Sequence, residues 1–354
     1  MKSKKLSNLT DKDVLAFDIS TNDGLIILSK GTLLNKDYIE KLNDFGINEV
    51  FIEDPNSTVI ETKKPSNVHE ARESILQNYC AIFCETAKNN GITKEKLDES
   101  VSNIIYSVIS KIEDNTLDIL YSANPFFCHY THALNTASLA VFLGTKMSLN
   151  DKEIRELATS ALLHDIGMYK LPQDILEKGG NLNEGDVNIV KEHSLHGYET
   201  SRAIKDISET CRKAILYHHE RFDGLGYPEK ISGKEIPLYS RIIAVADIFC
   251  SLTTKTRVHP GYSHIDVYEF ILASSGGYFD PEIVEVFQKH FVIYPIGTKI
   301  ELNNGRKGIV LSQNPGFPDR PNLKITHNDN GIEILPMKVS LLRRTNLKIV
   351  KILT

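Results

Sequence analysis

The stretch LATSALLHDIGMYK, residues 157–170, decides the fold and the chemistry expected of this chain. It reads as the end of an apolar helix, with His164 and Asp165 just before Gly167, a residue that readily leaves helical geometry. Adjacent His and Asp cannot share one helix face, but the turning backbone at a helix end can aim both at one point. Aspartate can bridge two metal ions, whereas each imidazole binds one. Taken alone, the pair is better explained as a helix end with chance polar residues, so the rest of the chain must decide.

Five further candidate ligands lie on other expected helices. They are His132 within THALNTASLAVFLG, His193 at the start of HSLHG, His218 and His219 at the end of a fourth helix, and Asp247 within RIIAVADIF. Nine of the twelve histidines fall between residues 129 and 264, and such clustering with aspartate favours a metal site. In isolation, His132 is better explained as a satisfied core histidine, and Asp247 as the partner of Arg241 or a nearby lysine.

The complete set of seven residues predicts a centre for two divalent metal ions. Its ligands are nitrogen and oxygen atoms, which favour iron, manganese or another transition metal over a structural cysteine-bound zinc. Seven ligands are too many for one tetrahedral ion, so two ions are the natural number. Two metals about 3.5–4 Å apart suit phosphoester hydrolysis, because they clamp the phosphate and generate hydroxide.

The same residues make the chain resemble a known family. His132, His164-Asp165 and Asp247 follow the H…HD…D order of the HD phosphohydrolase superfamily. The segments HDIG, HSLHG, HHERFDGLGYP, IPLYSRIIAVAD and FDPEIVEVF follow the longer pattern of the HD-GYP family, over about residues 100–292. The resemblance implies an all-helical domain and a metal-dependent phosphodiesterase that hydrolyses cyclic di-GMP to pGpG, with some members continuing to GMP.

The family pattern also implies a role for each ligand. Asp165 would bridge the metals and, with His164, form the catalytic pair. Two sets of three would complete the sites: His132, His164 and Asp247 at one metal, and His193, His218 and His219 at the other. The signature Gly226-Tyr227-Pro228 would lie on a loop beside the substrate, and this loop is also proposed to contact diguanylate cyclase partners. Substrate contacts are expected from Tyr227, Arg241, Lys170 and Arg257, with a solvated surface as the alternative for Arg257.

Three positions depart from the family pattern. The residue after HDIG, usually lysine, is Met168, and Lys170 is the candidate replacement for its charge. Cys128 stands where members with three metals carry glutamate, and Cys250 stands where aspartate usually follows the VAD segment. These departures leave the ligands intact, so they predict metal binding with slow turnover. The alternatives are a catalytically weak sensor of cyclic dinucleotides and a hydrolase of another cyclic dinucleotide.

Residue patterns along the chain predict a mainly α protein with β-containing ends. The expected parts are a small α+β accessory module (1–54), a linker (55–67), a helical connector (68–99), the all-helical HD-GYP domain (100–292) and a small β-rich module (293–354). The helices are expected from apolar residues three and four apart, and the C-terminal strands from short apolar runs separated by NNG, NPGFPDRP and NDNG.

Composition excludes several classes of protein. The chain has 354 residues, 41 basic and 46 acidic, so its net charge of −5 does not suggest a general binder of nucleic acid or membrane surfaces. It has no run of about 18 apolar residues, so no transmembrane helix is expected. Its start, MKSKKLSNLT, lacks the apolar core of a signal peptide, so a cytoplasmic protein is expected. Cyclic di-GMP is the expected partner, as the substrate, and neither a nucleic acid polymer nor a membrane is expected to bind. The sequence leaves a homodimer as an alternative to a monomer.

Overall fold

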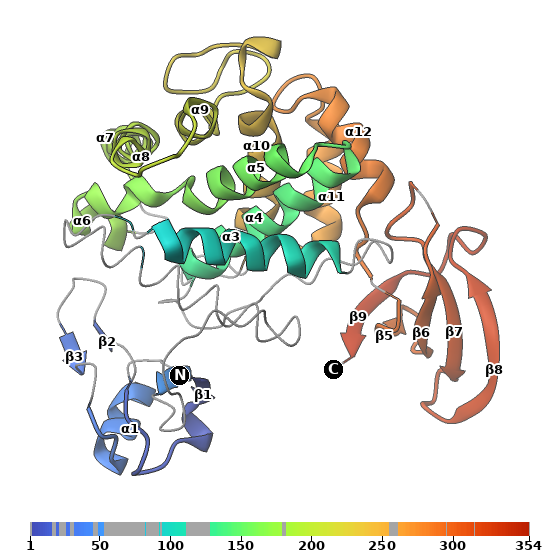
Figure 1. Cartoon of the computed structure of the whole chain (residues 1–354). Helices are drawn as coiled ribbons and strands as arrows, with labels where there is room; N and C mark the ends of the chain where they lie inside the picture. Colours follow the sequence, from blue (N-terminus) through green and yellow to red (C-terminus); the bar gives the residue numbers. More distant parts are fainter. Residues whose placement is uncertain are drawn as a thin grey trace.

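The central part of the chain is a bundle of helices, with a five-stranded sheet following it and a small α+β unit preceding it (Figure 1). The computed structural model describes residues 2–15, 19–20, 26–28, 32–44, 49–52, 82, 92, 94–110, 128–178, 182–254, 261–294, 296–314 and 316–353. The mainly α fold predicted from the sequence is confirmed. The predicted linker, and nearly all of a helix expected over 69–88, lie outside the described residues.

Helices make up most of the described residues of the central part. In chain order they are α3 (Lys94–Ile109), α4 (Cys128–Lys146), α5 (Asp151–Leu163), the 3-10 helix η3 (Ile166–Lys170), α6 (Gln173–Glu177), α7 (Glu184–Lys191), α8 (His193–Arg202), α9 (Glu209–Tyr217), the 3-10 helix η4 (Gly233–Glu235), α10 (Leu238–Thr253), α11 (His264–Ala273) and α12 (Pro281–His290). None of the helices in the described ranges combines the length and apolar character needed to cross a bilayer.

The sequence predicts helix starts capped by Asn150, Asn183, Ser208 and Asp280, and polar side chains begin helices at all four positions. Asn150 accepts hydrogen bonds from two backbone N–H groups of α5, and Glu153 accepts one from the backbone of Asn150. Asn183 makes the equivalent capping box for α7, while Ser208 and Asp280 cap α9 and α12. Such caps satisfy N–H groups that have no partner within the helix. The predicted helix starts are therefore confirmed.

One predicted helix is divided in the structure. The sequence predicts a single helix over about 184–204, but the chain forms α7 and α8 with a break at Glu192. There the backbone N–H of Glu192 donates to the carbonyl of Ile189, three residues back, at 3.0 Å. The break makes His193 the first residue of a new helix. The metal-ligand candidate therefore lies at a helix end rather than within a helix.

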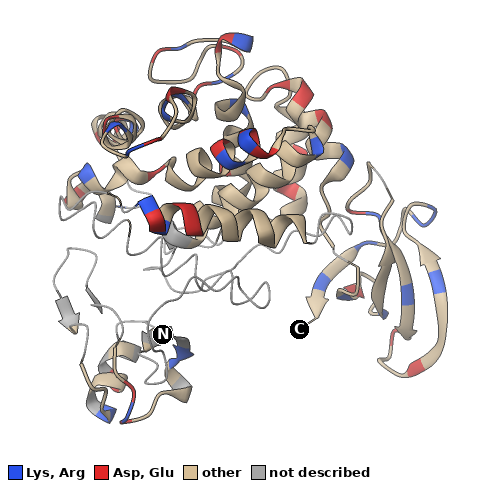
Figure 2. Cartoon of the chain, in the orientation of Figure 1, with Lys and Arg blue, Asp and Glu red and all other residues tan. Residues whose placement is uncertain are grey.

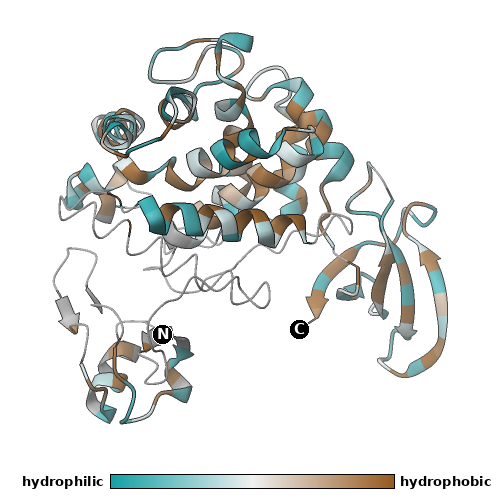
Figure 3. Ribbon diagram, viewed as in Figure 1, coloured by the Kyte–Doolittle hydropathy of each residue, from teal (hydrophilic) through white to brown (hydrophobic). Residues whose placement is uncertain are grey.

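Helices α4 and α10 form the centre of the bundle. Helix α4 packs against α3, α5, α10 and α12, and α10 also contacts α9 and α11. Both helices carry few charged residues (Figure 2). Among Lys, Arg, Asp and Glu, α4 contains Lys146, and α10 contains Arg241 and Asp247. Figure 3 shows apolar residues along the same inner helices. Fully burying a large apolar side chain such as Phe142 or Phe249 contributes about 1.5–3 kcal/mol. A carboxylate in this setting, such as Asp247, needs a partner.

The C-terminal sheet is antiparallel, with the strand order β8-β7-β6-β5-β9. Its strands are β5 (Lys299–Leu302), β6 (Lys307–Ser312), β7 (Asn322–His327), β8 (Glu333–Ser340) and β9 (Ile349–Leu353). The sequence predicts β5, β6 and β7. It does not predict the two edge strands, β8 and β9. The buried side chains of the sheet, including Ile300 and Leu323, belong to the same continuous core as the helices.

The N-terminal unit has a core of its own. It contains β1 (Lys2–Lys5), the 3-10 helix η1 (Leu6–Asn8), β2 (Ile19–Ser20), β3 (Ile26–Leu28), α1 (Lys36–Asp44) and β4 (Glu49–Ile52). Strand β1 pairs antiparallel with β4, and β2 with β3. Leu15, Leu34, Leu42 and Ile52 are buried in a cluster separate from the central core. The sequence predicts a strand over Leu25–Leu28, a helix over about Lys36–Phe45 and a strand over Val50–Ile52. The bounds of β3, α1 and β4 lie within one residue of these predictions.

Candidate metal centre

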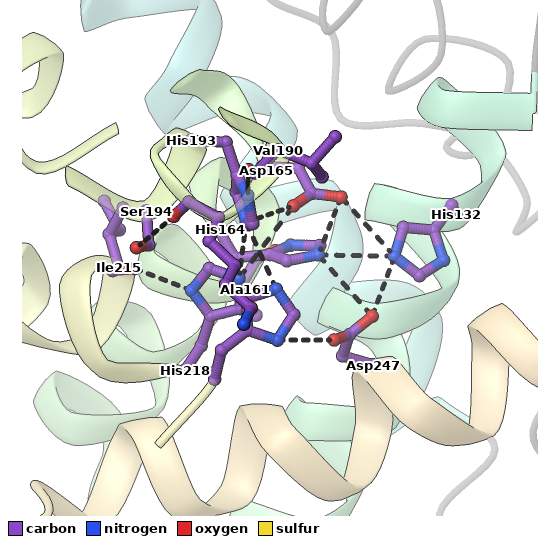
Figure 4. Close-up of polar contacts among 12 residues, drawn as sticks. His132, Ala161, His164, Asp165, Val190, His193, Ser194, Ile215, His218 and Asp247 are labelled. Atoms are coloured by element: carbon purple, nitrogen blue, oxygen red, sulfur yellow. Dashed lines mark hydrogen bonds and ion pairs between the residues drawn. The ribbon is translucent and has the colours of Figure 1, made fainter. Parts of the chain in front are cut away.

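The seven ligand candidates come together at one point in the helical bundle (Figure 4). They come from five places in the chain: His132 from α4, His164 and Asp165 from the end of α5, His193 from the start of α8, His218 and His219 from the end of α9, and Asp247 from α10. Two groups have ligand atoms within 4.8 Å of one another, and they share Asp165: His132, His164 and Asp165, and Asp165, His193, His218 and His219.

Asp165 joins the two groups through its two carboxylate oxygens. Oδ2 lies 3.3 Å from Nε2 of His164 and 3.7 Å from Nε2 of His132. Oδ1 lies 3.4 Å from Nε2 of His193 and 3.9 Å from Nε2 of His218. Each oxygen therefore faces a different group of imidazoles, which is the geometry of a carboxylate that could be shared by two cations.

Asp247 contacts members of both groups. Its Oδ1 lies 3.1 Å from Nε2 of His132 and 3.9 Å from that of His164, and its Oδ2 lies 3.9 Å from Nδ1 of His219. The salt bridge between Asp247 and Arg241 considered above does not form. Arg241 instead bonds to the Asp280 carboxylate and donates to the carbonyl of Ile236. Asp247 faces the histidines instead.

Three of the imidazoles are held in one tautomer by backbone carbonyls. Nδ1 of His164 lies 2.7 Å from the carbonyl oxygen of Ala161, and His193 and His218 make the same contact with the residues three before them, at 2.7 and 2.6 Å. A carbonyl only accepts, so each Nδ1 carries the proton. The contact arises at helix ends, where carbonyls lack a partner within the helix. Nε2 of each ring therefore points to the centre.

The inward-facing nitrogens of the second group lie close together. Nε2 of His193 is 3.3 Å from that of His218 and 3.1 Å from that of His219. Burial holds the pKa of His218 and His219 well below their usual range, so both are neutral. With the proton of His218 on Nδ1, its Nε2 offers a lone pair, and neutral imidazole is the form that binds a metal. The donor set of this group therefore fits a divalent cation.

Electrostatics at the first group favour an anionic carboxylate. Burial alone would raise the pKa of Asp165, but the surrounding His164, His193 and His132 hold it well below its usual range. Burial alone would lower the pKa of His164, but Asp165 and Asp247 raise it to about 9. Asp165 is therefore anionic, and a cation bound at Nε2 of His164 would displace the proton from that nitrogen.

Gly167 allows η3 to approach α8, and Gly197 allows α8 to pack closely against α9. A Cβ on Gly167 would lie 2.0 Å from the carbonyl oxygen of His193 and 2.4 Å from the nitrogen of Gly197. A Cβ on Gly197 would lie 2.9 Å from Ile215. No side chain fits at Gly167, and this contact sets the distance between Asp165 and His193. The glycine of HDIG therefore belongs to the construction of the centre.

The loop after α9 covers the second group of ligands. The ring of Tyr227 stacks on His219, with centroids 4.8 Å apart and planes inclined by 28°, and the Tyr227 N–H donates to the His219 carbonyl. A Cβ on the preceding Gly226 would lie 2.4 Å from the nitrogen of Arg221, so only glycine permits this approach. Glu220 anchors the loop from within, because its buried Oε1 accepts the backbone N–H groups of residues 229 and 230 at 2.7 and 2.9 Å. The sequence reasoning assigned no role to Glu220, although an acid directly after His218-His219 was a signal.

The predicted substrate contacts have different surroundings. Tyr227 lies beside the ligands, as described. Lys170 is largely exposed, with its ammonium 3.6 Å from the Glu199 carboxylate. Arg241 is occupied by Asp280 and a carbonyl. Arg257 lies outside the described residues.

The three departures from the family pattern are placed as follows. Met168 lies on η3 and is half-buried. Cys128 is the first residue of α4, and its side chain lies outside the described part. Cys250 is fully buried on α10, and burial raises the pKa of its thiol, which is therefore neutral.

The central helical domain gathers histidines and aspartates at helix ends. The family model described as "HD domain" matches residues 115–283. Together with the relatives below, this match supports the HD-GYP family that the motifs predict.

Similar proteins agree with this assignment. "Cyclic di-GMP phosphodiesterase PA4108" from Pseudomonas aeruginosa is 31% identical over 210 residues, which are 59% of this chain and 50% of that protein. "3'3'-cGAMP-specific phosphodiesterase 2" from Vibrio cholerae is 26% identical over 210 residues, 57% of this chain and 38% of that protein. The chain thus spans half or less of the length of these two relatives. Among solved structures, Bd1817, an HDG"Y"P protein from Bdellovibrio bacteriovorus, has a TM-score of 0.54 at 16% identity, and covers 80% of this chain and 97% of its own. That likeness confirms the HD-type fold.

Proposed function

We propose that the protein is a metal-dependent phosphodiesterase that hydrolyses cyclic di-GMP to pGpG, with GMP as a further product. The observation that carries the proposal is the convergence of inward-facing Nε2 atoms and carboxylate oxygens on Asp165. The name of the relative from P. aeruginosa supplies the substrate class. The proposal takes residues 100–292 as the catalytic domain and the flanking parts as accessory modules.

In this proposal, the seven residues would hold two divalent cations, iron or manganese. When bound, the cations would supply charge stabilisation at the phosphate and activation of water for attack. Asp165 lies between the two sites and contributes the shared negative charge, and His164 presents Nε2 to the same point. Asp247 faces His132 at 3.1 Å and completes the side of the centre formed by α4 and α10.

The chain's other residues position the substrate and exclude water. The ring of Tyr227 shields His219 and offers a surface beside the ligands on which a guanine base can stack. Burial raises the pKa of the Tyr227 phenol, so it stays neutral. Leu225, on the same loop, is 71% exposed, and we take this loop as the contact for a diguanylate cyclase partner.

Two other functions have support of their own. Hydrolysis of a mixed cyclic dinucleotide is favoured by the V. cholerae relative, whose name specifies 3'3'-cGAMP. Binding of cyclic di-GMP with little turnover is favoured by Met168, which leaves the position after HDIG without a cation. All three functions require the same metal centre.

One experiment separates these functions. Protein purified anaerobically is analysed for metal content and then incubated with cyclic di-GMP or 3'3'-cGAMP, and linear products are identified. The proposal expects two metals per chain and faster hydrolysis of cyclic di-GMP than of 3'3'-cGAMP. Stoichiometric binding without products would favour the sensor, and preferred hydrolysis of 3'3'-cGAMP would favour the mixed dinucleotide. A metal-loaded protein that neither binds nor hydrolyses either compound would refute the proposal.

A further inference from the structure

Lys191 lies beside the metal centre and was assigned no role by the sequence. It is the last residue of α7, two positions before the ligand His193. Its Nζ lies over the ring of Tyr227, 5.5 Å from the ring centroid. Tyr227 in turn stacks on His219, with centroids 4.8 Å apart, and its edge faces His193. The Lys191 ammonium therefore lies next to the Tyr227 ring, which in turn lies next to the His219 imidazole.

The charge of Lys191 is available for an anionic ligand. Within the part of the chain that the structure describes, no carboxylate oxygen lies within 4.0 Å of its Nζ. The other basic residues considered have acidic partners: Lys170 pairs with Glu199, and Arg241 with Asp280. Lys191 is half-buried, and its ammonium has no carboxylate partner among the described residues. This extra positive charge beside the metal centre favours a ligand that is more negative than the metal ions alone would neutralise.

A cyclic dinucleotide carries two phosphates, and a metal pair held by the seven ligands would neutralise the one that is cleaved. The second phosphate then needs a cation from the protein, and lysine serves as a point charge for phosphate. Met168 supplies no charge, and Lys170 is engaged elsewhere. A phosphate of a ligand bound beside the Tyr227 ring would then meet the Lys191 ammonium, which lies 5.5 Å from the ring centroid.

We propose that Lys191 binds the phosphate that is not cleaved, and so replaces the cation missing at Met168. This inference rests on the proposed phosphodiesterase function and assigns the charge that recognises its substrate. Loss of a charged hydrogen bond of this kind lowers kcat/KM by roughly 10- to 150-fold.

The test compares a substrate that has two phosphates with one that has a single phosphate. Lys191→Met, Lys191→Arg and the wild type are loaded with metal and assayed with cyclic di-GMP and with bis(p-nitrophenyl) phosphate. We expect Lys191→Met to lose roughly 10- to 150-fold in kcat/KM for cyclic di-GMP, mainly through KM, with a much smaller loss for the single-phosphate ester. Lys191→Arg should retain most of the activity. Lys205→Met, at an exposed residue after α8, controls for the change in net charge.

Several outcomes would overturn the role of Lys191. Equal losses for both substrates, with less bound metal, would mean that Lys191 only supports Tyr227 and His219. An unchanged kcat/KM for cyclic di-GMP in Lys191→Met would also refute it, while leaving the proposed function intact. If the wild type does not hydrolyse cyclic di-GMP, the proposed function fails. Equilibrium dialysis of metal-loaded wild type and Lys191→Met with cyclic di-GMP then tests the role of Lys191 independently of turnover. Weaker binding by the variant supports the role, and equal or absent binding refutes it.

Discussion

Replacing Gly167 by alanine would test whether the centre depends on the close approach of η3 to α8. The added Cβ would lie 2.0 Å from the His193 carbonyl oxygen, whereas real Cβ contacts essentially never fall below 3.0 Å. The two segments must therefore separate by about 1 Å. Both atoms nearest to the new Cβ, in His193 and Gly197, are backbone atoms, so no side-chain rotation can relieve the clash.

The expected effect follows from that displacement. Asp165 Oδ1 lies 3.4 Å from His193 Nε2, so a shift of about 1 Å moves His193 away from the shared carboxylate. A misplacement of that size costs on the order of 10²-fold in rate. Overpacking also lowers the free energy of unfolding by about 1–3 kcal/mol. The metal held by the second group should be lost before the metal held by His132 and His164.

Metal analysis, steady-state hydrolysis and thermal unfolding of the Gly167→Ala protein measure these effects. Gly277→Ala is the matched control, because a Cβ there meets no atom nearer than 3.8 Å, an ordinary contact. A Gly167→Ala protein with the metal content and turnover of the wild type would show that the spacing of η3 and α8 does not define the centre.

Four further results are expected. Asp165→Ala should lose metal and turnover together, because the two groups would no longer share a negative charge; normal values of both would refute its assignment. Elemental analysis should find two metals per chain rather than three, because Cys128 replaces the carboxylate of three-metal members, and three fully occupied sites would contradict this. Lys170→Ala should change kcat/KM little, since its ammonium pairs with Glu199; a large loss would identify Lys170 as a substrate contact. Glu220→Ala should lower the free energy of unfolding by about 1–3 kcal/mol by leaving two loop N–H groups without their acceptor, and should reduce turnover while metal content is kept; an unchanged melting temperature would argue against the anchor.

The helices could be predicted from the sequence because local signals determine them. Apolar periodicity and the caps at Asn150 and Asn183 act within a few residues, and both helix starts are confirmed. Strands β1 and β8 lack such signals. The residues of β1, KSKK, form a strand only through pairing with β4, and β8 exposes Leu335 at its outer edge. Their pairing depends on contacts distant in sequence, which propensity does not contain.

The ligand set could be proposed from the sequence because its residue types are unusual on apolar helices. The structure brings all seven together. The sequence did not indicate how the centre is surrounded. Lys191 and Glu220 looked like ordinary charged residues, and only the folded loop places one over Tyr227 and the other beneath residues 229 and 230. Arg241 shows the converse, since its partner Asp280 lies 39 residues away in the chain.

The continuous core has a consequence for how the molecule melts. Buried side chains from Val101 on α3 to Ile349 on β9 belong to one cluster, so the helical bundle and the C-terminal sheet should unfold as one cooperative unit. The N-terminal cluster around Leu15 and Leu42 is separate and should give its own calorimetric transition. A chain cut after Tyr294 would lose Gln313, whose side-chain amide donates to the Tyr294 carbonyl, and would lose the part of the shared core that the sheet supplies. The sheet is therefore a structural part of the folded helical domain rather than an appendage.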